Sequence, residues 1–202
     1  MFHSPVRRAA LCAAAVLCFT GPAALAQPKD GLPTPGPVLK ANPATAVPAG
    51  VRTINWDDLV PKDWDPMKEF KGVDMNAFSD ADPRAAAMMK KLREVWDNAP
   101  VNPALVGQNV RIPGFAVPLE EGKDGGVKEF LLVPYFGACV HSPPPPANQI
   151  IHVLPKAAAK LRSMDAVWIT GTLVTVKTDS YMGAASYRVE ATSVAPYAEK
   201  PR

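Results

Sequence analysis

Three residues in the middle of this chain have types and spacing that suit metal chemistry: Cys139, His141 and His152. The chain holds three cysteines and three histidines in all, and the others lie within its first 18 residues. Thiolate and imidazole ligands suit zinc or copper far better than calcium or magnesium, which take oxygen ligands. We therefore predict a transition-metal site, with zinc or copper as the cofactor, at these three residues.

The spacing of these residues is compatible with convergence on one ion. Cys139 and His141 are two positions apart, so in extended backbone both side chains leave the same face. The four prolines that follow, Pro143 to Pro146, favour a stiff segment about 12 Å long. A strand that carries His152 back beside Cys139 would complete three ligands. The fourth position is open to water or to a more distant group: Glu129, Asp165 or Met182.

Each of these residues also has an ordinary structural interpretation. Free cysteine is among the most buried residue types, and a single histidine is often a hydrogen-bonded core or loop residue. If the N-terminal cysteines are removed, Cys139 has no partner for an internal disulfide. The sequence leaves open whether Cys139 is a buried apolar residue, a metal ligand or a free thiol.

The sequence does not favour an enzyme. It contains no G-x-S-x-G elbow, phosphate-binding loop or dinucleotide-binding glycine pattern. Cys139 and His141 lie too close along one strand for the usual geometry of a nucleophile and its base, and no third orienting group is evident.

Residues 1–26 are typical of a signal peptide. Arg7 and Arg8 precede an apolar stretch from Ala9 to Phe19, and Ala24-Leu25-Ala26 is a small-residue cleavage site. The apolar stretch is too short to span a membrane and no comparable stretch follows, so we expect no integral membrane segment after cleavage. Because the new first residue would be Gln27 rather than cysteine, we expect a protein without a lipid anchor, exported to a periplasm.

Charge argues against a nucleic-acid partner. Cleavage removes Arg7 and Arg8, so 22 basic residues become 20 against 19 acidic residues. A nucleic-acid-binding protein would normally carry a basic patch that neutralises phosphates. We therefore expect no nucleic acid among its partners.

Beyond the leader, the sequence predicts a linker and one domain. Residues 27–50 contain six prolines among small residues, typical of a disordered linker. Residues 51–202 are long enough for a single globular domain. Within it, a short strand and a turn precede Trp64, and a helix capped by Asp82 runs from Pro83 to about Asn98.

The rest of the domain has mainly the patterns of strands. The order of elements predicts a mainly β fold: a small OB-like five-stranded barrel with one short internal helix, preceded by the N-terminal helix. The expected strands are 110–119, 127–136, 148–155, 166–178 and 185–197, and the expected internal helix is 156–163.

The segment LLVPYFGACVHSPPPPANQIIHV resembles the bacterial family named for domain of unknown function 3299, whose hallmark is close to VPYFGACIHxPPPPxNQ. INWDDLVP and GAASYRVEATSVAPY also resemble that family's ends, so the similarity covers about Ile54 to Tyr197. The resemblance implies small exported proteins, in part lipid-anchored, encoded near ABC transporters or metal-responsive periplasmic proteins. The Gln27 start departs from the anchored members.

The resemblance also implies a functional surface around the hallmark, although it implies no established activity. An envelope ABC transporter or a periplasmic metal protein is the partner it implies. An alternative to metal binding is a metal-free module that docks on such a transporter through its proline-rich loop. Besides the three metal ligands, the expected binding surface comprises Tyr135, Phe136, Pro143, Pro144, Pro145, Pro146, Asn148 and Gln149.

The leader gives the first testable prediction. We expect the protein isolated from its native host to begin at Gln27 and to carry no acyl group. Intact-mass measurement checks this, and a retained leader or an added acyl mass would contradict it.

Overall fold

The computed structural model describes residues 36–41, 46–71, 82–122, 125–139 and 144–197. The predicted signal peptide, His141 and Pro143 lie outside these ranges, as does most of the predicted linker. Within these ranges, no helix has the length and apolar character needed to cross a membrane.

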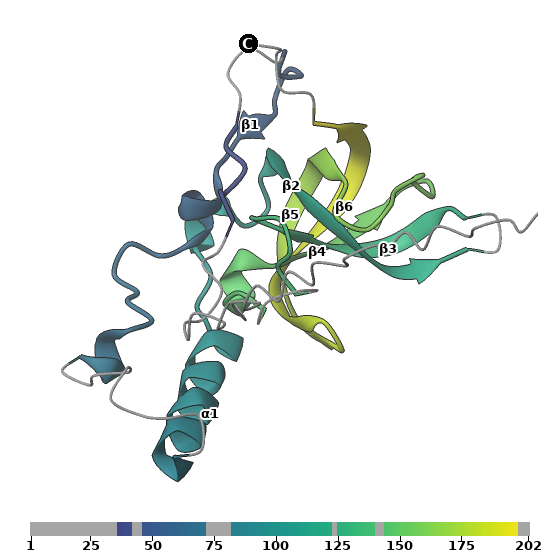
Figure 1. The fold of residues 1–202 in the computed structure, drawn as a ribbon. Coiled ribbons are helices and arrows are strands. Elements are labelled where there is room, and N and C mark those ends of the chain that lie inside the picture. The colour runs from purple at the N-terminus through teal and green to yellow at the C-terminus, as the bar shows by residue number, and fades with distance from the viewer. Residues whose placement is uncertain (1–35, 42–45, 72–81, 123–124, 140–143, 198–202) are drawn as a thin grey trace, which may run out of the picture. The chain divides into compact units, whose positions relative to one another are not determined.

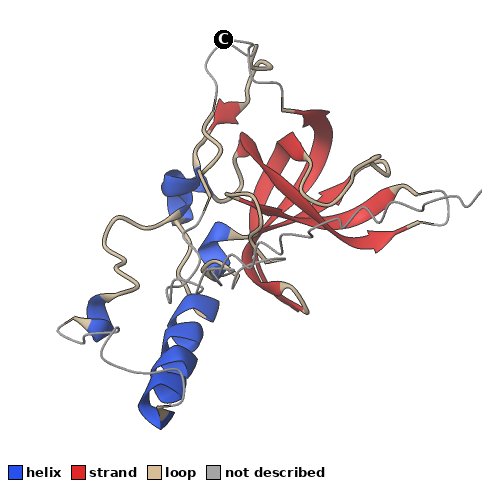
Figure 2. Ribbon diagram, viewed as in Figure 1, coloured by secondary structure: helices blue, strands red, loops and turns tan. Residues whose placement is uncertain are grey.

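The described chain is mainly β, as the sequence predicts (Figure 2). One α-helix, α1 (Pro83–Asp97), precedes most of the strands. The strands are β1 (Arg52–Thr53), β2 (Asn109–Glu121), β3 (Val127–Val133), β4 (Ile151–Pro155), β5 (Ala166–Ser180) and β6 (Gly183–Pro196). Short 3-10 segments are η1 (Trp56–Leu59), η2 (Lys68–Phe70), η4 (Pro103–Leu105) and η5 (Ala147–Gln149).

The strands form one mixed sheet (Figure 1). Their order is β1-β2-β3-β4-β6-β5, and β2 also pairs with β5. These pairings close the hydrogen bonds of the sheet into a ring. The pairing of β2 with β5 is antiparallel and runs from Asn109 opposite Thr172 to Phe115 opposite Ala166. Two pairings are parallel: β1 with β2 and β4 with β6.

Alternation along the strands separates two apolar clusters, one on each face of the sheet. Phe130 and Leu132 of β3 belong to the larger cluster, which also contains Ile151 and Val153 of β4. We call the face that carries this cluster the inner face. Leu131 lies between Phe130 and Leu132, belongs to the smaller cluster and faces the other way, onto the outer face.

The helix predicted from Pro83 is present as α1. The Asp82 side chain accepts a hydrogen bond from the Arg84 N–H at 2.8 Å, and Pro83 occupies the first turn. Of the apolar side chains of α1, Leu92 is buried, whereas Met89 is 40% exposed. The apolar residues of the helix are therefore only partly used for packing within the described residues.

The predicted helix at 156–163 is wrong, because this segment is irregular and forms a β-bridge at Ala159. The backbone N–H of Val127 donates to the carbonyl oxygen of Ala159, and the N–H of Ala159 donates to the carbonyl oxygen of Val127. The nitrogen-to-oxygen distances are 2.8 and 2.9 Å. Leu161 packs against the larger cluster. Pairing with the start of β3 and burial of Leu161 outweigh the helix propensity of KAAAKL, which is a weak preference.

The predicted strand boundaries also needed correction at two places. β3 ends at Val133 rather than residue 136, and Gly137 follows with a φ of 86°. The strand expected from residue 148 begins at Ile151, after η5. Residues 134–139 and 144–150 of the hallmark segment therefore lie outside the named strands.

Candidate functional site

His152 lies on the outer face of the sheet between Glu129 and Arg188. We call these three residues the polar row. His152 is directly opposite Leu131 of β3 and Arg188 of β6. Its neighbours along β4, Ile151 and Val153, belong to the larger cluster, so His152 must face outward. Its side chain is nevertheless only 4% exposed.

Both ring nitrogens of His152 are engaged. Nε2 lies 2.5 Å from Oε1 of Glu129, whose side chain is 32% exposed. Arg188 donates from Nε to Nδ1 at 3.2 Å. A guanidinium can only donate and an ionised carboxylate can only accept. The two contacts therefore require the tautomer with its proton on Nε2 and its lone pair on Nδ1.

The backbone explains how Glu129 reaches His152. Glu129 is two residues before Leu131 on β3, so both side chains lie on the outer face. Leu131 is opposite His152, which makes Glu129 the diagonal neighbour within reach of a long side chain. A register shift in the β2 and β3 pairing falls at Glu129, which is opposite Glu120.

Cys139 is a half-buried free thiol at the edge of the smaller cluster. Its φ is 64°, a left-handed conformation that is uncommon for residues other than glycine. Burial raises the pKa of the thiol from 9.0 to about 12, and the Arg93 guanidinium opposes only part of this rise. Without a bound cation, the thiol is therefore protonated at neutral pH.

The described part of the proline run is packed against the turn between β5 and β6. Pro145 is buried, and Pro144 and Pro146 are half-buried. A Cβ added to Gly183, whose φ is 138°, would lie 2.9 Å from Cβ of Pro144. The close approach and the φ value both require glycine here. Pro144 to Pro146 are therefore packed against the protein rather than freely projecting.

Asn148 and Gln149 tie the end of the hallmark segment to the chain before β2. Asn148 is fully buried and donates from Nδ2 to the Pro100 carbonyl oxygen at 2.9 Å. Its Oδ1 is buried without a hydrogen-bond partner in the described structure. Gln149 donates from Nε2 to the Trp56 carbonyl oxygen at 2.9 Å. Both amides therefore act as internal anchors, although the sequence placed them on a binding surface.

Phe136 is the most exposed residue of the expected binding surface that the structure describes. Its side chain is 58% exposed and packs edge-on against Phe115, with ring centroids 5.7 Å apart. Tyr135 is half-buried and forms a bridge with Val38. Tyr181, at the turn between β5 and β6, is 80% exposed.

The structure brings Cys139 and His152 to the same side of the sheet. Cys139 packs against the smaller cluster, and that cluster includes Leu131, the direct neighbour of His152. His141 lies outside the described residues. In the described ranges, no three His, Cys, Asp or Glu side chains converge as a metal group would require.

Of the distant candidates for a fourth ligand, Glu129 contacts His152 directly. Met182 borders the smaller cluster. Asp165 lies elsewhere and accepts a hydrogen bond from the Arg162 N–H at 2.8 Å. The sequence did not identify Arg188, because only the parallel pairing of β4 with β6 places it beside His152.

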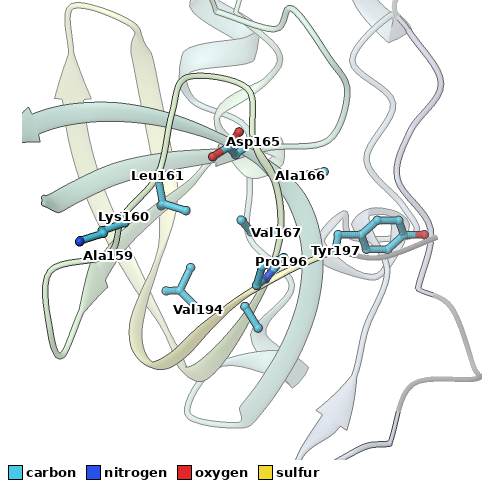
Figure 3. Close-up of a pocket in the computed structure, with 10 residues that line it drawn as sticks. Ala159, Lys160, Leu161, Asp165, Ala166, Val167, Val194, Pro196 and Tyr197 are labelled. Carbon is cyan, nitrogen blue, oxygen red and sulfur yellow. The ribbon is translucent and has the colours of Figure 1, made fainter. Parts of the chain in front are cut away.

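Asp165 instead lines a cavity of about 440 Å³ between the start of β5 and the end of β6 (Figure 3). Leu161, Val167 and Val194 lie around this cavity, and Lys160 is its one basic residue. None of the three predicted metal ligands Cys139, His141 and His152 lines it.

Comparisons with known proteins identify relatives. The family model described as "Protein of unknown function (DUF3299)" matches residues 56–196. The crystal structure of a DUF3299 family protein from Pseudomonas aeruginosa PAO1 is 36% identical, with a TM-score of 0.58, over 74% of this chain and 98% of that chain. A comparison with curated proteins gave no match.

Two aspartyl-tRNA synthetases were also similar in structure, too weakly to support an argument. The putative enzyme from Leishmania major Friedlin is 12% identical with a TM-score of 0.34, over 50% of this chain and 20% of that chain. The enzyme from Entamoeba histolytica is 14% identical with a TM-score of 0.30, over 87% of this chain and 29% of that chain.

The hydrogen bonds of His152 give a spectroscopic prediction. In metal-free mature protein, nitrogen NMR should show His152 with a protonated Nε2 and an unprotonated Nδ1, because Glu129 accepts and Arg188 donates. Two histidines, His141 and His152, remain after cleavage of the leader. The histidine signals that persist in the variant His141→Ala therefore belong to His152. A dominant Nδ1–H tautomer would contradict this geometry.

Proposed function

Since this chain belongs to the DUF3299 family of proteins of unknown function, we propose its function from its own site. It is a periplasmic protein that binds a transition metal, zinc or copper, as an accessory of an envelope transport or metal-homeostasis system. Cys139, His141 and His152 are the proposed ligands. The proposed export rests on the signal-peptide pattern of residues 1–26.

The contact between His152 and Glu129 carries this proposal. A histidine that ligates a metal commonly donates its other ring N–H to a carboxylate, which fixes the tautomer and the ring orientation. Glu129 is in that position on Nε2, at 2.5 Å. The pattern leaves Nδ1 as the nitrogen with the lone pair, which is the form of imidazole that binds a metal.

Cys139 would supply a thiolate. Burial disfavours that thiolate in the metal-free protein, since it raises the pKa of the thiol to about 12. A bound cation provides the missing positive charge and releases the proton. Metal affinity should therefore rise with pH across the neutral range, because each bound metal displaces the Cys139 proton.

We further infer that the closed sheet is of the OB type. The order β2-β3-β4-β6-β5 with return to β2 supports this, together with the parallel contact of β4 with β6. OB folds typically bind ligands on their second and third strands and on nearby loops. Those strands correspond to β3 and β4, which carry Glu129 and His152. This correspondence is an analogy of fold alone. An experimental structure in which β2 and β5 are unpaired would overturn the inference.

A second candidate function is docking on an envelope ABC transporter without any metal. The exposed rings of Phe136 and Tyr181 favour docking. Phe136 belongs to the hallmark segment, and Tyr181 lies in the turn between β5 and β6 that packs against the proline run. The supported proline run would lose little conformational entropy on binding. This candidate predicts no change in melting temperature on addition of zinc or copper.

Metal titration separates the two functions. We expect zinc or cuprous ion at a hundredfold excess over Kd to stabilise the mature protein by about 2.7 kcal/mol. For a domain of this size that is a rise of about 5 to 10 °C in melting temperature. Cys139→Ser should weaken binding by about 100-fold or more, beyond the loss typical of outer-shell substitutions. Calorimetry and thermal melts measure both.

Two further variants serve as a test and a control. His152→Ala should also weaken binding, whereas Asp179→Asn, at an exposed carboxylate near the end of β5, should leave it unchanged. Equal and weak binding by wild type, Cys139→Ser and His152→Ala would rule out the three-residue site. Docking would then remain as the function to test.

A further inference from the structure

Arg188 occupies the nitrogen of His152 that a metal would need. It lies directly opposite His152 in the parallel pairing of β4 with β6, and its Nε donates to Nδ1 at 3.2 Å. Nε2 is engaged by Glu129 on the other side. In the metal-free protein, neither ring nitrogen of His152 is therefore open to a new ligand.

An N–H donor and a metal ion cannot share the single lone pair of Nδ1. Arg188 must move away before His152 can coordinate. The guanidinium also carries a permanent positive charge, which repels an approaching cation in a site that is largely removed from water. Hydrogen-bond competition and charge repulsion therefore act in the same direction, against metal binding.

The sheet offers Arg188 another partner. Glu190 is two residues further along β6, so its side chain lies on the same face, and it is exposed. A guanidinium released from His152 can pair with this carboxylate at the surface. Glu129 keeps its contact with Nε2 in both states, since nothing about coordination at Nδ1 requires it to leave.

We infer that Arg188 is a gate on the metal site. It holds Nδ1 of His152 while the protein is metal-free and yields it to a cation of sufficient affinity. This inference rests on the proposed metal-binding function and adds its regulation. A metal must bind imidazole strongly enough to displace Arg188, so the gate favours zinc or cuprous ion over ions that bind imidazole weakly.

The test compares Arg188→Met with wild type by competition against a chromophoric zinc chelator. Removal of the charged hydrogen bond should tighten zinc binding by about 10- to 100-fold, the range expected for one hydrogen bond to a charged group. Arg188→Lys keeps the charge but changes the donor geometry, so it should bind with intermediate affinity. The matched control is Arg52→Met, at an exposed arginine of β1.

The outcomes distinguish the gate from the metal function itself. If wild type and Arg188→Met bind zinc equally, the gate is wrong and the metal function stands. If neither protein binds zinc, both are wrong. If Arg188→Met alone binds zinc, Arg188 blocks His152 without yielding to zinc, which overturns the gate and contradicts metal binding by the wild type. If Arg188→Met does not fold, Arg188→Lys takes its place in the test. Weaker zinc binding by folded Arg188→Lys than by wild type would overturn the gate.

Discussion

The pairing of β2 with β5 determines which side chains of the sheet face the core. It closes the sheet into a ring, so each of the strands β2 to β6 is hydrogen-bonded to a strand on either side. Because side chains alternate along a strand, ring closure assigns each residue to the inner or the outer face. A shift of β4 by one residue would turn His152 into the apolar core and Ile151 out of it. The apolar packing therefore fixes where the polar row can form.

The polar row on the outer face depends on the register of the sheet. Glu129, His152 and Arg188 come from three neighbouring strands, and two registers determine their contacts. Glu129 selects the proton position on the imidazole, and Arg188 satisfies the remaining nitrogen. A nearly buried histidine is thus fully hydrogen-bonded when no metal is present, which avoids the cost of an unpaired polar group. In the proposed function, the contact with Glu129 orients the ring for coordination, and Arg188 leaves Nδ1 when a metal binds.

Local chemistry allowed much of the fold to be predicted from the sequence. Alternating strands and the Asp82 cap followed by Pro83 correctly indicated a mainly β fold and α1. The segment 156–163 was misjudged, because pairing of Ala159 with Val127 is a tertiary contact that overrides local propensity. The closing pairing of β2 with β5 likewise joins strands far apart in the chain. No local pattern specifies its register.

Only part of the candidate site could be predicted from the sequence, and whether Cys139 and His152 bind a metal stays a prediction. The concentration of cysteine and histidine singled out these two residues, which lie on the same side of the sheet. It could not identify Arg188, which is 36 residues from His152 along the chain. It also could not separate exposed from buried residues within the hallmark: Phe136 projects into solvent, whereas Asn148 is fully buried. Those differences depend on the path of the segment over the sheet.

In the proposed function, one ion is held by a thiolate and imidazoles from the hallmark segment and β4. X-ray absorption spectroscopy of zinc-loaded protein measures this coordination. We expect one sulfur ligand at about 2.3 Å and imidazole nitrogens at about 2.0 to 2.1 Å, with one nitrogen lost in His152→Ala. A zinc shell of oxygen and nitrogen without sulfur, unchanged in His152→Ala, would contradict it.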